Sequence, residues 1–241
     1  MTNDTQRFIN RELSLLAFNH RVLKQAQDEH VPLLERLKFL CISCTNLDEF
    51  FEVRVARLKQ KVELGLLSPS IDGLTPSEEL AAIAKQTHDL VKQQYQTLNE
   101  NILPALGQEQ VNILTTAQWT DDIRRWVHQS FQQQILPVLT PIGLDPARPF
   151  PKVFNKSLNF IVHLQGKDAY KRRTRTAIVR APRSLPRLIR VPAAIGGDND
   201  DFVFLTTVVK QFVGEAFPGM DIASCFQFRV TRNSHLFVDE E

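Results

Sequence analysis

Residues Pro32–Leu64 read PLLERLKFLCISCTNLDEFFEVRVARLKQKVEL, a long amphipathic segment around which the rest of the chain is predicted to fold. Pro32 suits the first turn of a helix, where its missing N–H costs nothing. Apolar residues then recur at steps of three and four, which places them along one side of a helix. These residues are Leu33, Leu37, Leu40, Cys44, Leu47 and Phe51. The pattern predicts a helix that buries this stripe.

The middle of this segment carries a second helix-start signal. Thr45 with Asp48, and Asn46 with Glu49, both have the spacing of a capping box. We therefore expect one helix to end near Cys44 and another to begin near Asn46. A helix start exposes backbone N–H donors, and the Asn46 amide adds a donor and an acceptor. Two interpretations follow: Asn46 caps the second helix, or it contacts the polar edge of a ligand.

The neighbouring segments are also predicted to be helical. One helix spans residues 10–29 with Asn10 as its cap, and another begins at Thr75-Pro76-Ser77-Glu78, where Thr, Pro and Glu occupy favourable starting positions. Because short connections favour antiparallel neighbours, residues 1–105 are predicted to form an antiparallel helical bundle. The residues expected on the buried faces are Leu15, Phe18, Val22 and Ala26 in the former helix, and Leu80, Ile83, Ala84, Val91, Tyr95 and Leu98 in the latter.

Residues 106–241 have a different texture. Proline and glycine punctuate the chain, and the apolar period falls to two, which is typical of strands. The predicted strands cover residues 111–114, 158–164, 174–180, 185–191, 202–205 and 225–230, with helices around 119–131 and 207–217. The sequence therefore predicts an α+β fold in two domains, a helical bundle followed by an α+β domain with a mostly antiparallel sheet.

Basic residues gather between Lys156 and Arg190. This segment holds ten Lys or Arg against one acid, although the net charge of the whole chain is only +2. Arg173 and Arg175 share one face of a predicted strand, and Arg187 lies across from them if the neighbouring strands pair. Clustered guanidinium groups suit phosphate, because each can form two charge-assisted hydrogen bonds. The alternative is a solvated hairpin edge whose charge prevents aggregation.

The cysteines do not indicate a metal site. Cys41-x-x-Cys44 has neither a second cysteine pair nor a histidine pair at ligand spacing, and it falls on the helical stripe, so we expect these two residues to be buried thiols. The N-terminus has no apolar core of a signal peptide, and no run approaches the length of a membrane span. We expect a reducing cytoplasm, with attachment to a membrane surface left open.

Several quoted stretches resemble one family. ELSLLAFNHRVLKQA (Glu12–Ala26), PLLERLKFL (Pro32–Leu40) and TNLDEFFEVRVARL (Thr45–Leu58) resemble the start of the long bacterial polyphosphate kinases. VLTPIGLDPARPFPKVFNKSLNF (Val138–Phe160) resembles the entry to the head domain of the same family. The resemblance implies reversible transfer of the terminal phosphate of ATP to inorganic polyphosphate through a phosphohistidine. It also implies that Asn46 contacts the base of ATP.

The same resemblance implies what this sequence lacks. None of the six histidines matches a catalytic motif of the family, and there is no Gly-rich phosphate loop. The catalytic histidines and the ligands of Mg²⁺ are therefore expected outside residues 1–241. We expect the chain to contribute to nucleotide binding and to the assembly of a homodimer, with ATP, ADP and polyphosphate as partners.

Two other classes of protein remain as alternatives. One is a non-catalytic module that binds polyanions through the basic segment; only Phe160 and Tyr170 supply aromatic rings there, which argues against nucleic acid as a partner. The other is an assembly element, in which the helical bundle and the sheet pack against a second subunit.

Overall fold

The structure, a computed structural model, describes residues 7–145, 147, 149–166 and 176–233. The chain divides into two compact units. The first holds the described residues up to Gln108 together with those from Thr231 onward, and the second is Glu109–Val230. Helices build the first unit, and the second combines strands with helices, which confirms the predicted α+β fold class.

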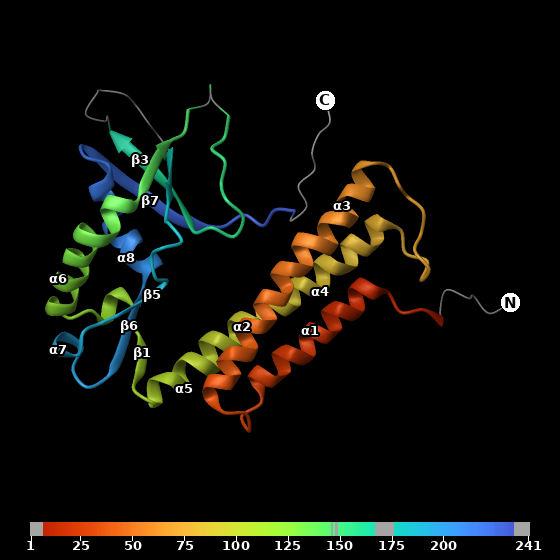
Figure 1. Cartoon of the computed structure of the whole chain (residues 1–241), viewed down its shortest axis with the longest axis horizontal. Helices are drawn as coiled ribbons and strands as arrows, with labels where there is room; N and C mark the ends of the chain where they lie inside the picture. Colours follow the sequence, from red (N-terminus) through yellow and green to blue (C-terminus); the bar gives the residue numbers. More distant parts are fainter. Residues whose placement is uncertain (1–6, 146, 148, 167–175, 234–241) are drawn as a thin grey trace. The chain divides into compact units, whose positions relative to one another are not determined.

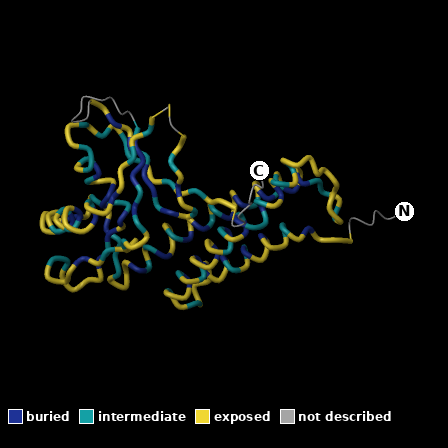
Figure 2. The backbone as a smooth tube through the Cα atoms, turned by 45° about the horizontal axis from the view of Figure 1, so that its top comes forward, coloured by how far each residue is buried: buried dark blue, intermediate teal, exposed yellow. Residues whose placement is uncertain are grey.

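The first unit is a helical bundle. In Figure 1, α1, α2 with α3, and α4 lie side by side, and α1 and α2 run in opposite directions. Figure 2 shows buried and exposed positions alternating along each helix. Its helical segments are α1 (Arg11–Gln27), α2 (Leu33–Glu49), a π-helical segment (Phe50–Val55), α3 (Ala56–Glu63), α4 (Pro76–Gln96), a second π-helical segment (Thr97–Ile102) and α5 (Leu103–Gln108).

The predicted break near Cys44 is wrong. Helix α2 continues through Thr45 and Asn46 to Glu49, and the Thr45 hydroxyl donates to the Cys41 carbonyl one turn earlier at 3.0 Å. Hydroxyl side chains inside helices commonly make this bond, so a capping-box spacing alone does not specify a helix start. The irregularity lies a few residues later, where Phe50–Val55 form a wider π-helical turn.

The π-helical turn changes which residues of this long helix are buried. The buried positions are Arg36, Leu40, Ser43, Leu47, Phe50, Glu52, Val55 and Leu58. The step of five between the buried apolar residues Phe50 and Val55 exceeds the three or four of an α-helix, as an inserted π-turn requires.

The predicted burial of the two helical cysteines is wrong, because Cys41 and Cys44 are both exposed. Cys225 is half-buried, and burial raises the pKa of its thiol.

Helix α1 also buries a face other than the predicted one. Its buried residues are Leu16, Asn19, Leu23 and Ala26. Leu15 and Phe18 are 39% and 50% exposed, so only Ala26 of the predicted face is fully buried. The apolar pattern failed because Asn19, a polar residue, occupies a core position of the helix.

The start of α4 confirms its prediction, whereas its buried face is only partly as predicted. The Thr75 N–H donates to Glu78 Oε2 at 2.9 Å, and the Glu78 N–H donates to Thr75 Oγ1, which completes the capping box. Tyr95 is exposed, although the apolar pattern placed it inside. The buried residues of α4 are Pro76, Glu79, Ile83, Thr87, Leu90 and Gln94.

The second unit contains two sheets in its described part. One is three-stranded with the order β1-β6-β5, and the other is four-stranded and antiparallel with the order β2-β4-β3-β7. Among the strands that the structure describes, only β1 and β6 pair in parallel, so the sheets are mostly antiparallel as predicted. The strands are β1 (Val111–Ile113), β2 (Thr140–Gly143), β3 (Asn159–Gly166), β4 (Thr176–Arg180), β5 (Leu188–Arg190), β6 (Asp200–Phe204) and β7 (Met220–Phe228).

Helices pack on these strands around one continuous apolar core. The core joins Val127 of α6, Phe160 of β3, Val179 of β4 and Val208 of α8, all of them buried. The helical segments of this unit are a 3₁₀ turn (Thr116–Gln118), α6 (Asp121–Ser130), a π-helical segment (Phe131–Ile135), a 3₁₀ turn (Leu136–Val138), α7 (Ala193–Gly196), α8 (Leu205–Phe212) and a 3₁₀ turn (Val213–Ala216). Among the described residues, no helix combines the length and apolarity that crossing a membrane requires.

Candidate functional site

A pocket of about 250 Å³ opens beside Asn46 in the helical unit. It lies between α1 and the region where α2 passes into the π-helical segment. Nine residues line it: Leu15, Leu16, Phe18, Asn19, Asn46, Glu49, Phe50, Val53 and Arg54. Leu15 and Phe18, the exposed apolar residues of α1, thus form a wall of this pocket.

The lining combines apolar walls with a few polar groups. Leu15, Phe18 and Val53 supply apolar surface, and the polar lining residues are Asn19, Asn46, Glu49 and Arg54. Small-molecule sites typically have this composition, in which apolar walls hold a ligand and a few polar groups orient it.

The wide turn after α2 supplies part of the pocket. Phe50, Val53 and Arg54 belong to the π-helical segment and line the pocket together with Glu49. Single π-helical turns inside α-helices occur frequently at functional sites. Arg54 Nε lies 3.9 Å from Glu12 Oε2 of α1, a long ion pair between the two helices that flank the pocket.

Asn46 is in the interior of α2, so the interpretation that it caps a helix is wrong. Its side chain is half-buried, and its Nδ2 donates to Asn19 Oδ1 at 3.3 Å. Asn19 Nδ2 in turn donates to the Ser43 carbonyl at 2.9 Å, and Gln94 Nε2 donates to Ser43 Oγ at 2.8 Å. A chain of buried polar contacts thus links α4, α2 and α1 behind the pocket.

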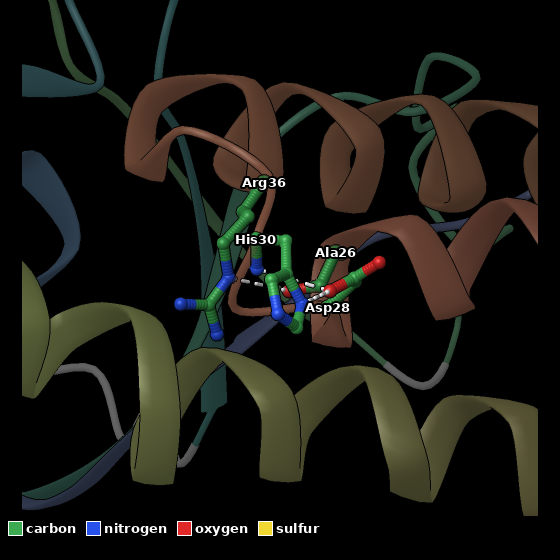
Figure 3. Close-up of polar contacts among 4 residues, drawn as sticks. All are labelled: Ala26, Asp28, His30 and Arg36. Atoms are coloured by element: carbon green, nitrogen blue, oxygen red, sulfur yellow. Dashed lines mark hydrogen bonds and ion pairs between the residues drawn. The ribbon is translucent and has the colours of Figure 1, made fainter.

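Hydrogen bonds also fix the connection between α1 and α2, the two helices that carry the pocket (Figure 3). Buried Arg36 donates through Nε to the Ala26 carbonyl at 3.0 Å. The backbone N–H of His30 donates to Asp28 Oδ1 at 3.0 Å, and its ring Nδ1 lies 2.9 Å from the same oxygen. These contacts lower the pKa of Asp28, the backbone hydrogen bond most strongly. The link therefore holds the C-terminal end of α1 against the start of α2.

The basic segment is only partly described. Arg173 and Arg175 lie outside the described residues, and Arg187 is exposed just before β5. The idea that Arg187 faces them from an adjacent strand is wrong, because β5 pairs with β6 in the other sheet and not with β4. Two further arginines of the segment have contacts within the protein: Arg183 donates to the Asn155 carbonyl at 2.7 Å, and Arg190 pairs with Asp200.

Reasoning from the sequence singled out Asn46 but missed Leu15, Phe18 and Asn19 as its neighbours in a pocket. A signal was present: Asn19 falls between Leu16 and Leu23 at helical steps of three and four. A polar residue at such a position needs a buried partner, and the partner here lies next to Asn46. Within the described part of the chain, no group of three or more His, Cys, Asp and Glu side chains could hold a metal ion.

Comparisons with known proteins give the same family over nearly the whole chain. Residues 8–114 match the family model described as the polyphosphate kinase N-terminal domain, and residues 122–241 match the polyphosphate kinase middle domain. A relative named polyphosphate kinase from Pseudomonas aeruginosa is 49% identical over 239 residues, which are 99% of this chain and 35% of the relative. Another of the same name, from Xylella fastidiosa, is 54% identical over 235 residues, or 97% of this chain and 34% of the relative.

A solved structure is similar as well. The crystal structure of polyphosphate kinase from Porphyromonas gingivalis superposes with a TM-score of 0.82 at 27% identity, over 96% of this chain and 34% of that one. The chain spans about a third of the length of the curated relatives it matches. Taken together, the two matching domain models and the close relatives show that the chain belongs to the polyphosphate kinase family, of which it carries the N-terminal and middle domains.

Proposed function

We propose that this chain supplies the nucleotide-base pocket of an enzyme that reversibly transfers the terminal phosphate of ATP to inorganic polyphosphate through a phosphohistidine. The observation that carries the proposal is the half-buried Asn46 amide beside the apolar wall of Leu15 and Phe18. An adenine ring has two apolar faces and an edge with adjacent donor and acceptor groups, and an asparagine amide matches that edge. The relatives are named polyphosphate kinase, which agrees with polyphosphate as a substrate.

The pocket contributes binding and orientation in this proposal. Binding energy gained at the base, far from the reacting phosphate, positions the phosphate chain for transfer. We place the catalytic histidines and the Mg²⁺ ligands beyond residue 241 in the full-length enzyme. The described residues contain no group of three or more His, Cys, Asp and Glu side chains that could hold a metal ion, and we assign no step of the reaction to one.

The test is Asn46→Ala in a full-length polyphosphate kinase that carries this sequence. Loss of the amide leaves the polar edge of the base unpaired, and we expect a loss of ATP binding of about 1–3 kcal/mol, seen mainly as a higher KM for ATP. Steady-state kinetics at varied ATP measures it. An unchanged KM for ATP would show that the base does not bind in this pocket.

Assembly belongs to the proposal too. We assign the chain to a cytoplasmic homodimer, and the exposed aromatic rings Phe150 and Phe154 of the second unit are candidates for its interaction surface. Sedimentation of the full-length enzyme tests this: a mass that stays at the monomer value at all concentrations would contradict it.

Polyphosphate binding by the basic segment is a separate part of the proposal. Exposed Arg187 is its described candidate, and Arg173 and Arg175 complete the set. Their replacement by Ala should weaken polyphosphate binding and reduce its dependence on salt, because fewer counterions are released. Equal salt dependence in the variant would leave these charges as a solvated edge.

A further inference from the structure

We infer that Asn19 of α1 positions the Asn46 amide for base recognition and thereby contributes to the preference for adenine over guanine. This inference rests on the proposed function and deepens it. Asn19 does not touch the base in this account. It acts through the contact between its Oδ1 and Asn46 Nδ2 at 3.3 Å.

The orientation of both amides follows from one backbone group. The Ser43 carbonyl can only accept, so the Asn19 atom that lies 2.9 Å from it must be the amide nitrogen. The oxygen of Asn19 is then the atom that faces Asn46. Because this oxygen is also an acceptor, Asn46 must present its own nitrogen to it. The Asn46 oxygen and its second N–H remain for a ligand.

Burial makes this orientation firm. Asn19 is 3% exposed and Ser43 is 0% exposed, so neither can exchange its partner for water without opening the bundle. Ser43 is held from a third helix, since Gln94 Nε2 of α4 donates to Ser43 Oγ at 2.8 Å. A fully connected buried polar network of this kind rigidifies its members.

The fixed amide discriminates between purines. Adenine places its N6 amino donor beside the N7 acceptor, which an amide oxygen and an amide N–H of fixed order match in two hydrogen bonds. Guanine places two acceptors, O6 and N7, on the same edge, so the Asn46 oxygen would face an acceptor. Without Asn19, the Asn46 amide is free to turn over, and the advantage of adenine shrinks.

The experiment compares four forms of a full-length polyphosphate kinase that carries this sequence: wild type, Asn19→Ala, Asn46→Ala and the double variant. For each form, KM and kcat are measured with ATP and with GTP. We expect Asn19→Ala to raise the KM for ATP about five- to tenfold and the KM for GTP by less. In the double variant, ATP should be bound no more weakly than in Asn46→Ala alone, because Asn19 acts only through Asn46.

Thr97→Val is the matched control. Thr97 is also buried in the bundle, where it is hydrogen-bonded to the Gln93 carbonyl and to Gln27. It takes no part in the hydrogen bonds that link Asn46, Asn19, Ser43 and Gln94. It should lower stability without changing the ratio of the KM values for GTP and ATP. If Thr97→Val changed this ratio as much as Asn19→Ala, general loosening of the bundle would explain the effect and the inference would be overturned.

The outcomes separate the two proposals. An unchanged KM for ATP in Asn46→Ala overturns the base pocket itself. A raised KM in Asn46→Ala, together with no effect of Asn19→Ala or with independent losses that multiply in the double variant, overturns only the positioning by Asn19. If Asn19→Ala fails to fold, Asn19→Ser replaces it, since serine keeps a small polar group in the buried site but has no amide to offer Asn46. The same results are expected, and the same ones would overturn the inference.

Discussion

The two compact units bury different chemistry. In the helical unit, many core positions are polar: Asn10, Asn19, Arg36, Ser43, Glu52, Glu79, Thr87, Gln94 and Thr97. In the described part of the sheet unit, buried polar residues are few, namely Ser157, Asn159 and Asp201, and the core is one continuous apolar cluster. Apolar residues therefore specify the sheet unit, whereas hydrogen-bonded pairs between helices specify much of the bundle. The candidate pocket lies in the unit with the polar core.

The largest loss of stability is expected when a side chain in the apolar core of the sheet unit is truncated. Phe160→Ala removes a fully buried ring from the middle of the four-stranded sheet and should lower the free energy of unfolding by about 3–5 kcal/mol. Chemical denaturation measures it. Phe226→Ala is the control, because Phe226 is an exposed ring on the adjacent strand, and it should change stability by less than about 0.5 kcal/mol. Similar losses in both variants would show that the core is not where the structure places it.

The polar core of the bundle should respond differently. Ser43→Ala leaves buried Gln94 without its acceptor and should cost about 1–3 kcal/mol. Replacing both partners, as in Ser43→Ala with Gln94→Leu, removes the unpaired group and should restore part of that loss, which no second truncation in the apolar core would do. Urea unfolding of the two single variants and the double variant gives the coupling. Strictly additive losses would mean that the pair does not interact.

The smallest expected effect is at the start of α4, on the surface of the bundle. Hydrogen bonds from the Thr75 hydroxyl and N–H lower the pKa of Glu78 below its ordinary 4.5. A carboxyl with a lower pKa in the folded state stabilises the fold above its unfolded pKa, and that contribution disappears as the pH falls through the lowered value. Thr75→Ala should therefore cost about 1 kcal/mol at neutral pH and less in acid.

Thermal unfolding at neutral pH and well below pH 4.5 checks this prediction. Ser77→Ala, an exposed residue of the same helical turn, is the control and should show neither the loss nor its pH dependence. A loss in Thr75→Ala that is the same at both pH values would exclude the Glu78 carboxylate from the cap.

The same contrast explains what could be predicted from the sequence. Alternating apolar residues such as Phe160, Val162 and Leu164 placed β3 correctly, because apolar burial alone decides its face. The cap at Thr75 was also predictable, since its chemistry is local to one turn. Local signals and apolar burial therefore account for the elements that were predicted well.

The face of α1 and the course of α2 could not be predicted in this way. The buried Asn19 amide donates to the Ser43 carbonyl, and the buried Ser43 hydroxyl accepts from Gln94 of a third helix. A pattern of apolar residues carries no information on such partners. The π-helical turn at Phe50–Val55 inserts one extra residue, so the buried positions after it no longer follow the spacing of the positions before it. Asn46 was identified through the family resemblance, and its pocket neighbours Leu15 and Phe18 required the structure.

The central claim is that Asn46 reads the base of ATP, and Asn46→Asp tests it most directly. Aspartate keeps the size and an acceptor oxygen but has no N–H to donate, and it adds a negative charge. In a full-length polyphosphate kinase that carries this sequence, the account predicts a KM for ATP raised by a factor equivalent to about 1–3 kcal/mol. It also predicts a kcat that changes less than KM, and a melting temperature lowered by the loss of the hydrogen bond to Asn19 Oδ1. ATP binding as tight as in the wild type would contradict the account.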